Sequence, residues 1–275
     1  MNKAYSFQAN IANSQDISMV KGRALRCILF DLGGTLWTRR EETASLAERH
    51  AQGKAGGMLR RTVVQKLFSH MDDNVLGTLL QQTIDGQMRA ESRRHPGYEP
   101  DYALVTMRAL QQMGLRDVDQ AQAGELFEAL RVRIPISRVL FPDTLSTLVA
   151  LKERGYLLGV VTNRHYGGPL FQEDMAAMGL LDYIEYGHMA ISADLGICKP
   201  HPTIFMHALN SLNVSPEEAA MVGNDLEADI TGSRALHLLS IWKPAGTLSA
   251  EKSRVLSAIE PDREIQQLSQ LLEMF

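Results

Sequence analysis

The sequence predicts an α/β fold: a parallel β-sheet covered by helices on both faces, with a second, all-helical unit inserted after the first strand. Between residues 141 and 242, short apolar runs that end in polar residues alternate with helical stretches. An isolated apolar run at residues 26–30 has the same character, whereas the intervening residues 39–138 are helical in composition. Strands that alternate with helices of this length favour right-handed crossovers and a parallel sheet.

The first predicted strand is the apolar run Cys27-Ile28-Leu29-Phe30, which is followed by Asp31, two glycines and Thr35. A short apolar run that ends in a carboxylate and then glycines is typical of a buried parallel strand leading into a tight loop. Asp31 is therefore expected at the carboxyl end of a strand, where open α/β sheets bind their ligands.

Residues 39–138 are rich in Glu, Arg, Gln, Leu, Met and Ala, with almost no β-branched runs. This composition predicts several amphipathic helices in a small bundle. Breaks are expected near residues 53–57, near 95–97 and around Gly114.

From residue 141 onward, helices and strands alternate. Asp143 is expected to cap a helix that ends at Gly155. The further predicted elements are strands at 156–161, 183–186, 219–222 and 238–242, and helices at 169–178, from Pro202 and at 226–236. In the tail after Gly246 the apolar spacing predicts an amphipathic helix that packs on the core.

Bulk properties bound the function. A chain of 275 residues suits one large domain or a core with an insertion, and a net charge of -4 favours neither nucleic acid nor an anionic membrane as a partner. Its two cysteines, Cys27 and Cys198, make no disulfide framework. No apolar run approaches the length of a membrane span, and residues 1–20 resemble a loose extension rather than a signal peptide. We therefore expect a cytoplasmic protein that acts on a small molecule; its oligomeric state is left open.

Polar groups follow four of the expected strands or their connecting loops. They are Asp31 with Thr35, Thr162 with Asn163, Lys199 with Pro200, and Asn224-Asp225 with Asp229. Because the carboxyl ends of parallel strands meet at one edge, these groups are expected to converge on one crevice.

In order and spacing, these segments resemble the four motifs of the haloacid dehalogenase-like (HAD) superfamily of hydrolases. The matching text is FDLGGTL at 30–36, VVTN at 160–163, GICKPHPTIF at 196–205, and MVGND at 221–225 continuing to Asp229-Ile230. No single motif is specific, but four in sequence order are. The resemblance implies a Rossmann-like catalytic core at residues 21–38 and 139–275, with a helical cap at 39–138.

The resemblance also implies roles. Asp31 would be the nucleophile, attacking phosphorus or carbon to form an ester with the enzyme. Lys199 would supply a fixed positive charge, and Thr162 would donate its hydroxyl to a phosphoryl oxygen. Thr35 and Asn163 are candidate substrate-binding residues.

A magnesium ion is the implied cofactor, held by Asp31, the main-chain carbonyl of Gly33 and side chains of the fourth motif. The candidates there are Asn224, Asp225 and Asp229. Counting back from Asp229 places Asn224, rather than Asp225, where many relatives have the direct ligand. Asp225 and Asp229 are four residues apart and are expected to share a helix face.

Gly33 departs from the phosphatase pattern, in which this position carries an aspartate that protonates the leaving group and later activates water. Three readings stay open. The first is a magnesium-dependent phosphomonoester phosphatase of low or restricted activity, which could recruit Arg164, His165 or a cap residue. The second is carbon-halogen or carbon-phosphorus cleavage; the latter uses a cap lysine, for which Lys54 and Lys66 are candidates. The third is a binding or scaffold protein with little or no turnover.

Overall fold

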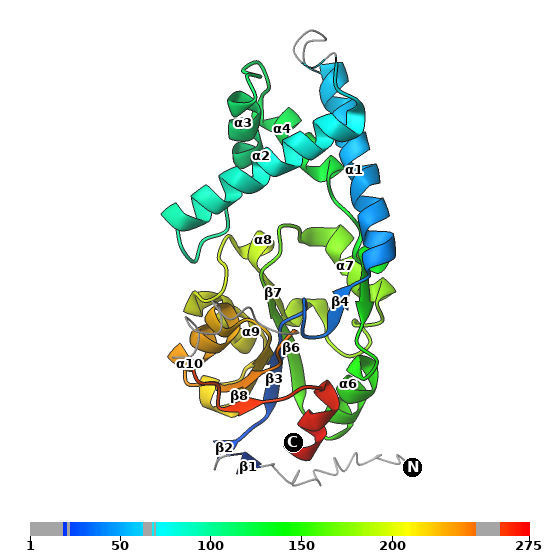
Figure 1. The fold of residues 1–275 in the computed structure, drawn as a ribbon. Coiled ribbons are helices and arrows are strands. Elements are labelled where there is room, and N and C mark those ends of the chain that lie inside the picture. Colours follow the sequence, from blue (N-terminus) through cyan, green and yellow to red (C-terminus); the bar gives the residue numbers. More distant parts are fainter. Residues whose placement is uncertain (1–18, 21–22, 63–67, 69, 246–258) are drawn as a thin grey trace, which may run out of the picture.

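The structure, a computed structural model, describes residues 19–20, 23–62, 68, 70–245 and 259–275. It has the α/β architecture that the sequence predicts, with a helical unit standing above a core built on a parallel sheet (Figure 1). The expected loose extension at residues 1–20 lies outside the described residues except for β1 (Met19–Val20), which pairs with β2 (Arg23–Ala24).

The core sheet has six strands in the order β10-β9-β8-β3-β6-β7, and all neighbouring pairs are parallel. Its strands are β3 (Cys27–Phe30), β6 (Leu157–Thr162), β7 (Met189–Ile191), β8 (Ala219–Gly223), β9 (Leu239–Trp242) and β10 (Arg263–Glu264). Because β3 lies between β6 and β8, Asp31 follows a strand at the centre of the sheet.

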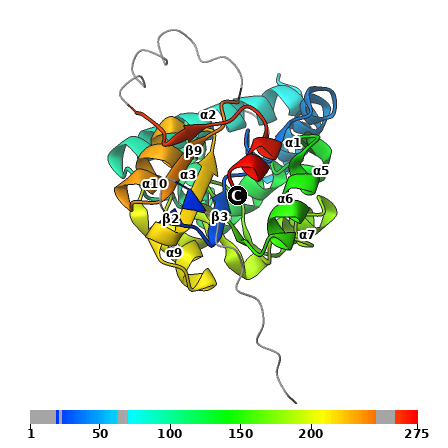
Figure 2. The ribbon, with the colours of Figure 1, turned by 90° about the horizontal axis from the view of Figure 1, so that it is seen from below.

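Alternate side chains of β3 enter two separate hydrophobic clusters. Ile28 and Phe30 pack on the face covered by α6 and α7, whereas Cys27 and Leu29 pack on the face covered by α9. Seen from below, these helices lie on opposite sides of the sheet (Figure 2). Both faces of β3 are therefore buried, which explains why the strand is apolar at every position. The core helices are α6 (Thr144–Glu153), α7 (Gly168–Ala177), α8 (Ser192–Leu195), α9 (Pro202–Leu212) and α10 (Gly232–Ala235), the last preceded by a π-helical segment, Leu226–Thr231.

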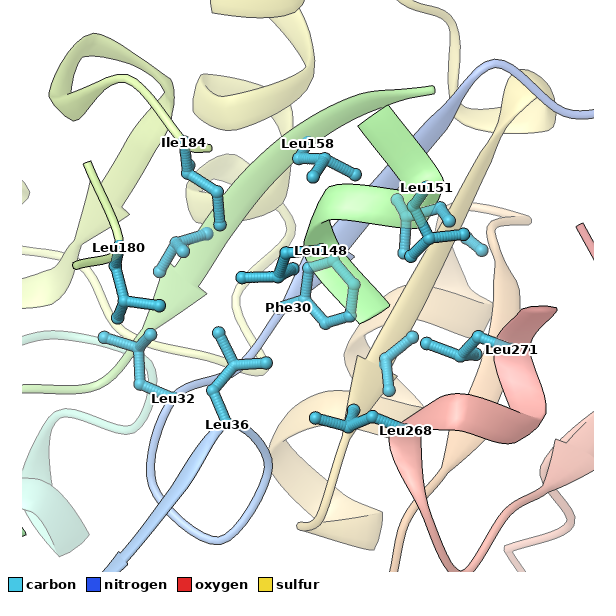
Figure 3. Packing of buried hydrophobic residues seen from close by; sticks show 14 of the residues in the cluster. Phe30, Leu32, Leu36, Leu148, Leu151, Leu158, Leu180, Ile184, Leu268 and Leu271 are labelled. Carbon is cyan, nitrogen blue, oxygen red and sulfur yellow. The ribbon is translucent and has the colours of Figure 1, made fainter. Parts of the chain in front are cut away.

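The C-terminal segment packs on the core, as the sequence predicts, with Leu268 and Leu271 buried near Phe30 (Figure 3). Its helix, Leu268–Glu273, is a 3₁₀-helix. The expected hydrogen-bonded cap of α6 is not formed: Asp143 Oδ2 instead accepts from the Ser269 N–H at 2.9 Å, so this carboxylate fastens the C-terminal segment.

The helical unit consists of helices that share a hydrophobic cluster of their own. Its chain enters and leaves through the antiparallel pair β4 (Trp37–Arg39) and β5 (Arg138–Leu140). Aspartates cap three of the helices by accepting backbone N–H bonds. The helices of this cluster are α1 (Glu41–Thr62), α2 (Asp73–Arg94), α3 (Tyr102–Gln112) and α4 (Gln120–Ala129). The short α5 (Ile134–Ser137) follows them, and its Ile134 packs in the core cluster.

The expected helix break at residues 53–57 is wrong, because α1 runs through these glycines without interruption. A Cβ atom on Gly56 would lie 1.9 Å from the Asp73 carbonyl oxygen, and one on Gly77 would lie 1.8 Å from the Gln52 carbonyl oxygen. The glycines therefore allow the backbones of α1 and α2 to approach closely.

The expected strand at residues 183–186 is also wrong. This stretch holds a turn and the start of a 3₁₀-helix, Tyr186–His188, and the strand follows at β7. Leu180 and Ile184 are fully buried from the turn, so their apolar character reflects core packing without strand pairing. A further strand, β10, lies beyond the one predicted as last.

The helical unit contacts the core beside the carboxyl edge of the sheet. The Glu99 N–H donates to the Gly196 carbonyl at 3.1 Å, and the Cys198 N–H donates to the Gly97 carbonyl at 3.0 Å. At a second contact between the two parts, the Tyr166 hydroxyl of the core donates to the Phe127 carbonyl of α4 at 3.0 Å. None of the helices in the described ranges has the length and apolarity that a bilayer crossing requires.

The two glycines of α2 give a matched test of this packing. Gly77→Ala is expected to lower the free energy of unfolding by about 1–3 kcal/mol, because its methyl group would overlap the α1 backbone. Gly86→Ala meets nothing within 4 Å, and is expected to raise the stability by about 0.5–1 kcal/mol through helix propensity alone. Denaturation followed by circular dichroism measures both. Equal stabilisation by the two substitutions would contradict the close approach of α1 and α2.

Candidate active site

The four predicted segments meet at the carboxyl edge of the sheet around one cavity of about 270 Å³. Every predicted site residue except Thr35 lines this cavity. Thr35 is fully buried and instead contacts Asp31. The cavity is lined by Asp31, Gly33, Thr162, Asn163, Arg164, Lys199, Asn224, Asp225, Ala228 and Asp229. A larger cavity of about 430 Å³ lies beside Phe141 and Lys243 and includes none of these residues.

The ammonium group of Lys199 lies at the centre of the site. Its Nζ donates to Asp31 Oδ1 at 2.6 Å, to Asp229 Oδ1 at 2.7 Å and to the Val161 carbonyl at 2.8 Å. Burial alone lowers the pKa of Lys199, but the adjacent Asp229 and Asp31 carboxylates raise it above its usual value. The side chain is only 3% exposed and stays charged because both carboxylates contact it.

Asp229 is positioned to hold Lys199. Its Oδ1 accepts from Lys199, and its Oδ2 accepts from the Asp225 N–H at 2.9 Å. Burial raises the pKa of Asp229 to about 6, and the Lys199 charge opposes that rise. Since both carboxylate oxygens are engaged within the protein, the geometry favours a positioning role over that of a direct metal ligand.

The carboxylate of Asp31 is oriented from two sides. Lys199 holds Oδ1, and the hydroxyl of the fully buried Thr35 donates to Oδ2 at 3.4 Å. Thr35 does not line the cavity, so its position suits orientation of Asp31 rather than contact with a substrate. Thr162, which ends β6, lines the cavity beside Asp31.

The side chain of Asn163 is used inside the protein. Its Nδ2 donates to the Lys199 carbonyl at 3.0 Å, and its Oδ1 accepts from the Lys199 N–H at 2.8 Å. This double hydrogen bond fixes the Lys199 segment against the end of β6. Because both polar atoms of the side chain are engaged, the predicted contact with a substrate would have to come from the backbone of Asn163.

The side-chain amide of Asn224 lies beside Asp31 and Gly33. In the orientation that satisfies hydrogen bonding, its Nδ2 donates to Asp31 Oδ2 at 3.3 Å and to the Gly33 carbonyl at 2.7 Å. The opposite orientation brings three oxygen atoms together, an arrangement that a hard cation stabilises. The donor types therefore fit a magnesium ion, although only one of the three groups carries a negative charge.

Asp225 and Asp229 line the same cavity, but Asp225 lies just outside the helix. It is the N-cap residue, and its Oδ1 accepts from the Glu227 and Ala228 N–H groups at 2.9 and 2.8 Å. Within the part of the chain that the structure describes, no cluster of three or more His, Cys, Asp and Glu side chains is arranged to hold a metal ion.

Gly33 leaves open space at the cavity wall. An added Cβ atom would have only Trp37 Nε1 within 4 Å, at 3.8 Å, so a side chain can begin at this position without a clash. Trp37 is fully buried, and its Nε1 has no hydrogen-bond partner among the described residues.

Arg164, which the sequence suggested as a possible replacement for the acid missing at position 33, lines the cavity. Its guanidinium carbon lies 6.0 Å from the ring centroids of both Trp37 and Phe171, and its Nε is buried without a partner among the described residues. Burial lowers the pKa of Arg164 to about 10, so it stays protonated at neutral pH. Its position directly after Thr162-Asn163 is the only signal in the sequence that places it here.

A second cavity of about 170 Å³ adjoins the first, and Asn163 lines both. It is bounded by the helical unit and the core. Burial raises the pKa of Glu99 and lowers that of His165, both of which line it. Glu99 was not foreseen from the sequence, because nothing in its surroundings marks the loop that contacts the core.

Comparisons with known proteins agree with this geometry. The model of the haloacid dehalogenase-like hydrolase family matches residues 25–237. A glyceraldehyde 3-phosphate phosphatase of Pyrococcus furiosus is 41% identical over 37% of this chain and 40% of its own length. The chain spans about half the length of the curated relatives it matches.

Two solved structures cover most of the chain. A HAD phosphatase from Thermococcus onnurineus matches with a TM-score of 0.57 and 24% identity, covering 90% of this chain and 97% of its own. A 2-haloacid dehalogenase from Pseudomonas syringae pv. Tomato DC3000 matches with a TM-score of 0.60 and 25% identity, covering 91% and 97%.

The capping geometry of Asp225 can be tested directly. Asp225→Ala removes the acceptor for two backbone N–H groups, so the free energy of unfolding is expected to fall by about 1 kcal/mol. Asp225→Asn keeps an acceptor and is expected to retain most of the stability. Chemical denaturation measures both. Unchanged stability of Asp225→Ala together with weakened Mg²⁺ binding in a calorimetric titration would show a metal ligand instead of a cap.

Proposed function

The chain belongs to the haloacid dehalogenase-like hydrolases, and on that premise we propose that it hydrolyses small phosphate monoesters through Asp31. The observation that carries the proposal is the buried Lys199 ammonium, which contacts both Asp31 and Asp229 at the cavity. The phosphatase names of several curated relatives support the same substrate class.

In the proposed mechanism, a carboxylate oxygen of Asp31 attacks phosphorus in line with the ester oxygen. The phosphorus–oxygen bond of the ester breaks, the leaving alkoxide takes a proton from solvent, and an aspartyl phosphate remains. Water then hydrolyses this ester and releases phosphate. A carboxylate is a weak nucleophile, so Lys199 offsets the negative charges of Asp31 and the phosphoryl group while the Thr162 hydroxyl binds a phosphoryl oxygen.

We propose magnesium as the cofactor, held by Asp31, the carbonyl of Gly33 and the Asn224 side chain, with Asp225 and Asp229 in the surrounding shell. When bound, the ion would add positive charge next to the phosphoryl group. An amide in place of a second carboxylate implies weak binding of the ion.

Gly33 restricts the proposed activity. General acid–base help is typically worth about a hundredfold to ten-thousandfold in rate, and no carboxyl group stands at this position. The enzyme is therefore expected to favour esters whose alcohols leave readily. In this proposal residues 39–138 act as the cap that selects the substrate, with the second cavity as its contribution to the pocket.

Carbon–halogen hydrolysis is a second candidate. Two features of the cavity favour it: position 33 lacks an acid, and the amide of Asn224 can bridge Asp31 and Gly33 without a cation. In that reaction Asp31 would displace halide from carbon, and water would then hydrolyse the carbon ester of Asp31. Chloride release from 2-chloropropionate separates this candidate from the first.

The nucleophile can be tested by Asp31→Asn. Release of p-nitrophenol from p-nitrophenyl phosphate, measured with and without Mg²⁺, is expected to fall at least about a thousandfold, because the amide cannot form the phosphoryl ester. Asp182→Asn, which removes an exposed carboxylate, serves as the control and is expected to behave as the wild type. Undiminished turnover in Asp31→Asn would show that the nucleophile is wrongly assigned.

The metal site can be tested with Mg²⁺ alone. Asn224→Asp places a second negative charge beside Asp31 and the Gly33 carbonyl, and is expected to tighten Mg²⁺ binding at least about tenfold. Isothermal titration calorimetry measures the affinity, with the exposed Asn210→Asp as the control for added charge. Equal affinities for Asn224→Asp and the wild type would place the ion elsewhere.

A further inference from the structure

Two N–H donors near Gly33 have no acceptor among the described residues. Trp37 Nε1 is the atom nearest to a side chain built at position 33, and Arg164 Nε belongs to a guanidinium stacked near the same indole ring. A buried donor without a partner costs about 1–3 kcal/mol. Two such donors beside one open space indicate that a hydrogen-bond acceptor belongs there.

The charge of Arg164 is also unpaired. The other cation that lines the cavity, Lys199, contacts two carboxylates, whereas Arg164 forms no ion pair with any described residue. Asp174, the nearby carboxylate on α7, is bound by Arg133. The guanidinium therefore keeps its charge-assisted hydrogen bonds available for an anion in the cavity.

We propose that Arg164 binds a carboxylate group of the substrate in the space that Gly33 leaves open. The substrate class is then the phosphate ester of a small hydroxy acid, with the carboxylate within a few bonds of the ester oxygen; the phosphate part of this inference rests on the proposed function. The carboxylate takes the place that an aspartate side chain at position 33 would occupy. The Trp37 and Phe171 rings lie beside the guanidinium, whose carbon is 6.0 Å from both ring centroids.

A carboxylate fits this space better than a second phosphate does. The planar guanidinium presents paired N–H donors that match the two oxygens of a carboxylate. The cavity of about 270 Å³ is small, and a Cβ atom added at Gly33 meets no clash, so the wall beside Gly33 has space for a small group. Since Lys199 and Thr162 stand beside Asp31, the phosphoryl group is assigned to them and Arg164 is left for the second anion.

A pair of probe compounds tests the assignment. 2-Phosphoglycolate and 2-hydroxyethyl phosphate differ only in a carboxylate against a hydroxymethyl group. Their affinities are measured by calorimetry in an Asp31→Asn background with Mg²⁺ present, so that no turnover is needed. 2-Phosphoglycolate is expected to bind at least about tenfold more tightly, as a charge-assisted contact implies. In Arg164→Gln the two compounds are expected to bind with about equal affinity, while the affinity for 2-hydroxyethyl phosphate stays nearly unchanged.

Two further variants serve as a control and as an independent check. Arg131→Gln removes a guanidinium that lies 4.8 Å from the Tyr166 ring outside the cavity lining, and it is expected to keep the preference. Gly33→Asp puts a carboxylate from the protein into the same space, and it is expected to abolish the preference even if Arg164→Gln fails to fold. As a single substitution, with Asp31 intact, Gly33→Asp is also expected to raise the rate at which 2-hydroxyethyl phosphate is hydrolysed.

Three results would overturn the inference: equal affinity of the two compounds, equal loss of both in Arg164→Gln, or a preference that persists in Gly33→Asp. If Arg164→Gln lowered the affinity for both compounds equally, Arg164 would be assigned to the phosphoryl group. The proposed function fails separately. If the wild type hydrolyses neither compound but the binding preference depends on Arg164, the carboxylate site stands and the phosphatase activity does not.

Discussion

The site depends on one buried ammonium group. Lys199 contacts Asp31 and Asp229 within 2.7 Å, in a region where an unpaired charge would be strongly unfavourable. Asp31 directly follows β3, Asp229 lies in the π-helical segment that follows β8, and the Val161 carbonyl belongs to β6. The charge network therefore requires these three neighbouring strands to end at the same level, and the parallel sheet with β3 at its centre meets that requirement.

The remaining charges of the cavity follow from that network. Asp229 and one oxygen of Asp31 are engaged by Lys199, and Asp225 is engaged by the backbone of the helix it caps. The two positions at which the family pattern would add carboxylates hold Gly33 and Asn224 instead. Relative to that pattern the cavity is less negative, while the guanidinium of Arg164 remains. Such a balance suits a substrate that brings more than one negative charge.

Most of the fold could be predicted from the sequence because β3, β6, β8 and β9 are almost entirely buried and consist mainly of apolar residues. The residues at their ends were predicted for the same reason. Errors arose where local sequence has two physical explanations: Ile184 is apolar because a turn buries it, and Gly56 is small because another helix backbone approaches it. Arg164 was named only as a possible replacement for the acid missing at position 33. Trp37 and Glu99 could not be found, since their place beside the cavities arises only from packing between segments that are distant in the sequence.

Gly33 and Arg164 have to be understood together. An aspartate at position 33 would supply both a proton-transfer group and an acceptor for the donors beside it; its absence removes the first and leaves the donors unsatisfied. If the substrate brings the carboxylate, the donors are satisfied only when the site is occupied, and the binding energy gained there depends on that group. A phosphate ester without a carboxylate lacks this contact. In the proposed reaction, the glycine that removes the general acid would therefore also sharpen discrimination between substrates. The glycine is then a determinant of specificity as well as a lost acid.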